Sequence, residues 1–65
     1  MNNNQTAIKI RGRSITIAVD GLTELEIGAL ADQVEKKMAA IEEKTATADT
    51  SKLAVMAALE FAAEL

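Results

Sequence analysis

The feature that most constrains the fold is a long apolar stretch near the C-terminus. From Leu53 to Leu59 the chain has seven apolar residues in succession, and the apolar character resumes after Glu60. These residues are strong helix formers without Gly or Pro, so we expect a helix over residues 50–65. Its solvated side is expected to be one line through Lys52, Glu60 and Glu64. The other sides must be covered, and a chain of 65 residues has little else to cover them. We therefore expect a dimer.

Small size and composition restrict the possible functions. A chain this short buries only about 60% of its unfolded surface, and disulfides, metals or oligomerisation usually reinforce such chains. The sequence has no Cys and no His, which excludes disulfides and the common zinc sites and removes the usual nucleophile–base pairs. The three glycines are scattered and form no phosphate-binding loop. We expect no catalysis, no cofactor, no metal and no small-molecule substrate.

Charge and hydropathy indicate the compartment. The net charge of −3 argues against general affinity for nucleic acid or for anionic membranes. The N-terminus lacks the basic and apolar regions of a signal peptide, and the apolar run is too short to span a bilayer. We expect a soluble cytoplasmic protein.

A β-hairpin is predicted over residues 6–19, after a disordered tail over residues 1–5. Apolar residues alternate with polar ones around Ile8, Ile10, Ile15 and Ile17, which indicates two half-buried strands. A two-residue type II′ turn at Gly12-Arg13 would pair Ile10 with Ile15 and Ile8 with Ile17. This register places all four isoleucines on one face.

A long helix is predicted over residues 23–44. Thr23 and Glu26 have the spacing of a capping box. Apolar residues follow at helical spacing, namely Ile27, Leu30, Ala31, Val34, Met38 and Ile41. The connector over 45–48 is short, and Asp49, Thr50 or Ser51 is available to cap the last helix. The expected fold is α+β with the order β–β–α–α, in a single domain over residues 6–65.

Three segments carry a resemblance to a known family: IxIRGRSITI in the hairpin, VEKKMAAIEEKT at the end of the first helix, and KLAVMAALEFAAEL in the last helix. From Ile8 to Leu65 the chain resembles the ZapA family of bacterial cell-division proteins. The resemblance implies an adaptor that binds FtsZ filaments at the division septum, bundles them and promotes Z-ring assembly. It also implies that the last helix continues into a coiled coil in the intact protein, and that tetramers need this coiled coil.

Two sets of residues are candidates for interaction sites. The resemblance implies that Lys9, Arg11 and Arg13 contact the partner protein, with Arg11 and Arg13 at or beside the turn, away from the isoleucine face. The alternative from the residues alone is that charges at the tip only keep an exposed strand end soluble. The predicted dimer interface consists of residues from the last helix: Leu53, Val55, Met56, Leu59, Phe61 and Ala62.

Two other functions remain open at this stage. One is a generic homodimerisation module whose partner-binding surface lies in a missing C-terminal region. The other is a nucleic-acid-binding hairpin, against which stand the acidic balance of the chain and the lack of aromatic residues beside Lys9, Arg11 and Arg13.

Overall fold

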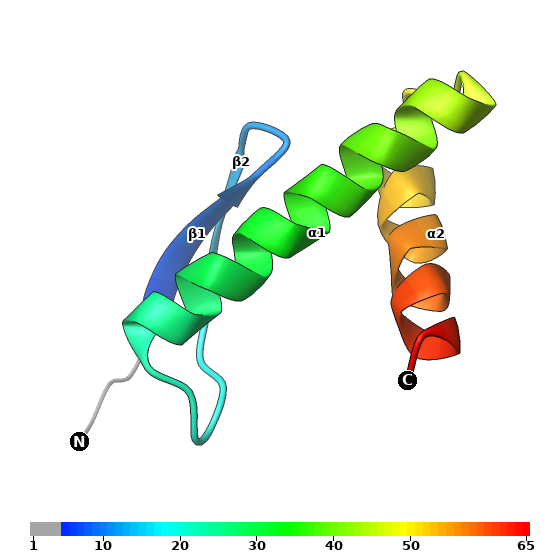
Figure 1. Cartoon of the computed structure of the whole chain (residues 1–65). Coiled ribbons are helices and arrows are strands. Elements are labelled where there is room, and N and C mark those ends of the chain that lie inside the picture. The colour runs from blue at the N-terminus through cyan, green and yellow to red at the C-terminus, as the bar shows by residue number, and fades with distance from the viewer. Residues whose placement is uncertain (1–4) are drawn as a thin grey trace. The chain divides into compact units, whose positions relative to one another are not determined.

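The computed structural model describes residues 5–65, and the chain is traced in Figure 1. Its elements are β1 (Thr6–Ile10), β2 (Arg13–Ile17), α1 (Glu24–Thr45) and α2 (Thr50–Ala63). The predicted α+β fold with the order β–β–α–α is confirmed. The tail predicted over residues 1–5 lies outside the described residues except for Gln5, which is exposed. The chain forms two compact units that divide between Gln33 and Val34, so α1 contributes to both.

In the first unit, β1 and β2 form an antiparallel hairpin whose turn differs from the predicted one. Ile10 lies opposite Arg13, and Ile8 lies opposite Ile15. The two turn residues are therefore Arg11 and Gly12, with φ angles of 53° and 83°. Positive φ at both positions defines a type I′ turn, which suits the twist of the strands and favours Gly at the second position. The predicted type II′ turn, and with it the pairing of Ile10 with Ile15, is wrong.

The corrected register changes the place of Arg13. In the observed register, the partner of each β1 residue lies two positions from the predicted partner. Because side chains alternate with period two along a strand, the isoleucines still share a face. Arg13 belongs to this face as the partner of Ile10, whereas Lys9, opposite Ser14, belongs to the other face. The expectation that Arg13 points away from the isoleucines is therefore wrong.

The start of α1 is fixed by the predicted capping box. The Thr23 backbone N–H donates to Glu26 Oε1 at 2.8 Å, and the Glu26 backbone N–H donates to Thr23 Oγ1 at 3.1 Å. The chain enters this cap through a turn closed by the Leu22 N–H and the Val19 carbonyl at 3.2 Å. Gly21 lies in this turn with a φ of 86°, a conformation that only glycine adopts at little cost.

Few residues of the first unit are buried. Among its described residues only Thr6 and Ile27 are buried, while Ile8, Ile10 and Ile17 are half-buried. Leu30, which the sequence pattern placed on the apolar stripe of the helix, is exposed, and Leu25 is 84% exposed. This unit therefore leaves much of its apolar surface accessible to solvent.

The second unit contains the end of α1 together with α2. Its buried residues are Met38 and Ile41 on α1 and Leu53 and Ala57 on α2. Spacings of three and four residues place each pair on one side of its helix. Burying a large apolar side chain contributes about 1.5–3 kcal/mol, so Met38, Ile41 and Leu53 supply most of the apolar stabilisation of this unit.

A four-residue connector joins the two helices. The Thr45 hydroxyl donates to the Ile41 carbonyl at 2.8 Å, and Ala46 reverses the chain with a φ of 58°. The Ala46 N–H donates to the Glu42 carbonyl at 2.9 Å. Of the three predicted capping residues, Asp49 is the N-cap of α2, because its side chain accepts from the Lys52 N–H at 3.1 Å.

Candidate protein–protein interaction surfaces

The hairpin tip holds the three basic residues that the sequence singled out, in three different settings. Arg13 is exposed at the start of β2, and its side chain has no hydrogen bond or ion pair with any other residue of the 5–65 range. Arg11, in the turn, is half-buried and already engaged in an interaction. Lys9 is exposed on the opposite face of the hairpin. The structure therefore separates these side chains, and Arg13 alone combines a free guanidinium with apolar neighbours on its own face.

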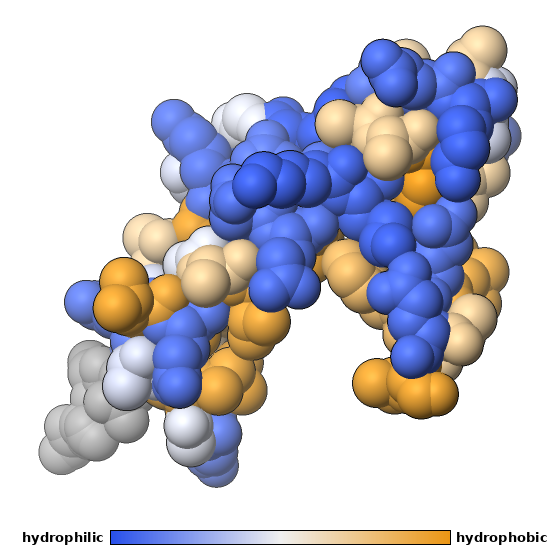
Figure 2. Space-filling model, viewed as in Figure 1, coloured by the Kyte–Doolittle hydropathy of each residue, from blue (hydrophilic) through white to orange (hydrophobic). Residues whose placement is uncertain are grey.

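The outer side of α2 carries exposed apolar residues. Val55 is 60% exposed and Leu59 is 66% exposed, and Ala58 and Ala62 are exposed with them. These four residues recur at spacings of three and four, so they form one side of the helix. We call this side the outer face of α2. In Figure 2 the surface over α2 combines apolar (orange) regions with a hydrophilic (blue) stripe.

The residues predicted for the dimer interface divide between the outer face and the interior. Val55, Leu59 and Ala62 belong to the outer face, and Met56 and Phe61 are half-buried at its margins. Leu53 is fully buried and belongs to the core of the second unit. The outer face also includes Ala58, which was not among the residues predicted for the dimer interface. Its helical spacing from Val55 and Ala62 was the signal that would have placed it there.

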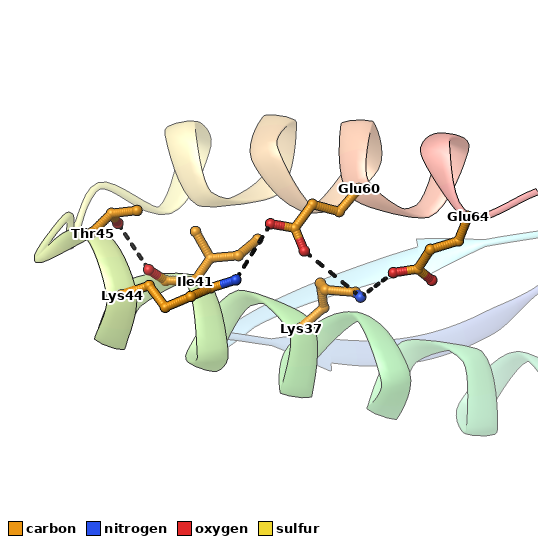
Figure 3. A network of polar contacts seen from close by, with 6 residues as sticks. All are labelled: Lys37, Ile41, Lys44, Thr45, Glu60 and Glu64. Carbon is orange, nitrogen blue, oxygen red and sulfur yellow. Dashed lines mark hydrogen bonds and ion pairs between the residues drawn. The ribbon is translucent and has the colours of Figure 1, made fainter.

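The opposite side of α2 carries a polar network, drawn in Figure 3. Lys37 Nζ donates to Glu64 Oε2 at 2.6 Å and lies 3.7 Å from Glu60 Oε1. Lys44 Nζ lies 3.9 Å from Glu60 Oε2. The ammonium of Lys37 also lies 4.9 Å from the centre of the Phe61 ring, within range of a cation–π interaction. Two cations of α1 thus join it to α2, and Lys37 alone has three partners.

This network gives partners to two residues of the line that was expected to be solvated on α2, and the side chains of Glu60 and Glu64 remain 41% and 56% exposed. Glu60 and Glu64 follow Leu53 and Ala57 at helical spacing, so they continue the inner side of α2 and meet Lys37. That periodic continuation was present in the sequence and was the signal that the earlier interpretation missed. Lys52, the third residue of the line expected to be solvated, is exposed.

The pairing alters the protonation of Lys37. The hydrogen bond to Glu64 is the largest cause that raises its pKa above the ordinary value, and the charges of Glu64 and Glu60 add to this effect. Partial burial, which disfavours the charged form, opposes it. The side chain of Lys37 is only 22% exposed, so the ammonium is held in place rather than freely solvated.

The described residues offer neither a metal site nor a membrane span. Over residues 5–65 no three His, Cys, Asp or Glu side chains are grouped so that they could hold a metal ion. None of the helices over the same residues has the length and the hydropathy that crossing a membrane requires. Within the described range, every buried side-chain nitrogen and oxygen has a hydrogen-bond partner.

A free arginine beside an apolar sheet face and an exposed apolar helix side are features of a small protein-interaction module. Residues 6–65 match the family model described as cell division protein ZapA. The chain therefore belongs to the ZapA family, a non-enzymatic family of cell-division proteins. This membership indicates an adaptor role in cell division. No curated protein and no solved structure gives a significant match.

Proposed function

We propose that this protein is a non-enzymatic adaptor that binds FtsZ filaments and promotes their bundling during Z-ring assembly at the septum, in the cytoplasm. Family membership supports the role in cell division. The observation that carries the choice of contact is the exposed Arg13, whose side chain has no partner among residues 5–65, in a chain of net charge −3.

Arg13 suits an acidic partner surface for physical reasons. A guanidinium is always charged and presents parallel N–H groups that match both oxygens of a carboxylate. The short hairpin holds the backbone of Arg13 by pairing with Ile10, so less backbone freedom is lost on binding than in a flexible loop. Arg11 is already engaged and half-buried, and it contributes less in this proposal. Lys9 contributes from the other face.

Bundling needs at least two filament-binding sites in one particle. The outer face of α2 provides for this, because Val55 and Leu59 expose apolar surface that a second copy of the chain can cover. A dimer has two hairpin tips, and two linked sites raise the effective affinity for neighbouring filaments. Tetramers are proposed only where the chain continues into a coiled coil.

Co-sedimentation with polymerised FtsZ tests the proposal. We expect the parent protein to pellet with the polymer, Arg13→Glu to lose most of this binding, and Arg11→Glu to lose less. Lys9→Glu measures the contribution of the opposite face. Lys36→Glu, at an exposed position of α1, makes the same change in net charge and should pellet like the parent. Binding should also fall with added salt, because exposed charges are screened.

A generic homodimerisation module is the second candidate, and the exposed outer face of α2 favours it independently of any filament. A parent protein that is dimeric but does not pellet with FtsZ at low salt would overturn the proposed function in favour of this candidate. Loss of pelleting by Lys36→Glu equal to that of Arg13→Glu would show that only net charge matters.

A further inference from the structure

The exposed part of β2 combines a charged and an apolar side chain on one sheet face. We propose that Arg13 and Ile15 form a single recognition surface for a segment that presents a carboxylate beside an aliphatic side chain. This inference rests on the proposed binding to FtsZ and adds the chemistry of the segment that the hairpin contacts. The partner is thus an acidic protein segment with an apolar residue, rather than a purely anionic surface.

The register places the two side chains together. Arg13 lies opposite Ile10, and Ile15 lies opposite Ile8, so all four belong to the same face of the hairpin. Residues two apart on a strand are separated by about 6.6–6.8 Å. A segment in an extended conformation has its own alternate side chains at this same spacing. One carboxylate and one aliphatic side chain, two positions apart, therefore match Arg13 and Ile15.

Exposure distinguishes Ile15 from the other isoleucines. Ile8, Ile10 and Ile17 are half-buried, whereas Ile15 is 43% exposed beside the exposed Arg13. When a partner covers the exposed side chain of Ile15, the burial of its apolar surface lowers the free energy of the complex. Water exclusion by Ile15 also strengthens the adjacent pairing of Arg13 with a carboxylate, since the local dielectric constant falls.

Charge and shape together select the occupant. The charge of Arg13 selects an acidic segment, and no described residue of the chain neutralises this arginine. Ile15 disfavours a phosphate backbone, which offers no apolar group to cover it. Because Lys9 belongs to the other face, the surface holds one cation, and we expect one dominant carboxylate in the partner segment.

The test is FtsZ co-sedimentation with Ile15→Thr, which removes apolar surface but keeps a β-branched residue suited to a strand. We expect a loss of apparent affinity of about fivefold, from the apolar area left uncovered. Thr16→Ala, on the opposite and also exposed face, is the matched control and should change binding less than about twofold. The loss in Ile15→Thr should depend less on salt than the loss in Arg13→Gln, which should shrink as salt rises.

The outcomes separate this inference from the proposed function. A parent that does not pellet overturns FtsZ binding itself. A parent that pellets, with Arg13→Glu impaired and Ile15→Thr equal to the parent, overturns only the shared surface. Sedimentation velocity and circular dichroism accompany each variant. If Ile15→Thr changes the mass of the particle, Ile15 serves self-association and the inference is also overturned.

Discussion

Ala46 is one of two non-glycine residues with a positive φ among those described, the other being Arg11. The φ of 58° at Ala46 lies in the left-handed region, which costs an L-residue with a Cβ about 1–2 kcal/mol. Most helices that end in this way have Gly at the corresponding position. The N–H of Ala46 nevertheless bonds to the Glu42 carbonyl, and this bond holds the strained conformation.

Ala46→Gly should therefore stabilise the protein. Gly removes the steric cost but loses more backbone entropy on folding, so the expected net gain is about 0.5–1 kcal/mol. Urea unfolding followed by circular dichroism measures it. Ala48→Gly is the control, because Ala48 lies in the same connector without a positive φ, and it should destabilise slightly or have no effect. An equal gain in both variants would mean that the strain at Ala46 is not the cause.

The protonation state of the Lys37 side chain affects the free energy of unfolding. Its pKa is raised in the folded state, first by the hydrogen bond to Glu64, so the folded chain holds this proton more tightly than the unfolded chain. The stabilisation is fully present below the unfolded pKa, about 10.4, and is lost as the pH rises through the folded pKa.

We expect the parent to lose stability as the pH rises above the unfolded pKa of lysine, and Lys37→Met to lose less over the same range. The free energy of unfolding in urea at each pH measures this difference. Glu64→Gln removes the largest cause of the raised pKa and should reduce the loss as well. Parallel pH profiles for the parent and both variants would contradict the proposed role of the pair.

At the scale of elements, α2 has two unlike sides. Leu53 and Ala57 are buried within the chain, while Val55 and Leu59 are exposed on the outer face. The chain's own residues therefore cover only one side of this largely apolar helix. The partly exposed network of Lys37, Glu60 and Glu64 joins the inner side of α2 to the end of α1.

Leu59→Asp should convert the expected dimer to a monomer or an unfolded chain. An aspartate on the outer face would carry a charge into an interface that excludes water, which costs free energy. Analytical ultracentrifugation with circular dichroism distinguishes the two results. The matched control is Leu25→Asp, at another highly exposed leucine, which should keep the mass of the parent. A folded monomer for the parent itself would refute this interface.

The elements could be predicted because each carries a local signal. Thr23 and Glu26 specify the start of α1, and alternation around Ile8 and Ile15 specifies the strands. The register of the hairpin could not be decided, because Gly12 suits a central position in both type I′ and type II′ turns and both keep the isoleucines on one face. The place of Arg13 in the candidate site depended on that register, so it emerged only with the structure.

At the scale of the whole molecule, the amount of buried apolar surface is small. Five apolar residues are buried among those described, and only Met38, Ile41 and Leu53 combine large size with complete burial. Chains below roughly 70–80 residues rarely gain more than about 3–5 kcal/mol from one core. The exposed Val55 and Leu59 of the outer face of α2 indicate that more apolar surface is available for association.

Stability should therefore depend on protein concentration. If folding and dimerisation are coupled, the melting temperature rises over a hundredfold increase in concentration, because mass action favours the dimer. Differential scanning calorimetry across that range, with the mass checked at each concentration, measures the shift. A constant melting temperature in a particle shown to be monomeric would contradict this coupling.

The short connector around Ala46 also has a kinetic consequence. Ile41 and Leu53, the large buried residues on either side of it, are only twelve positions apart in the sequence. Closing so short a loop costs little entropy, and helical contacts between near neighbours form in microseconds to milliseconds. We therefore expect the pair formed by the end of α1 and α2 to assemble before two chains meet. The outer face of α2 is then preformed at each encounter, so the slow step of assembly is a collision between chains, second order in protein concentration.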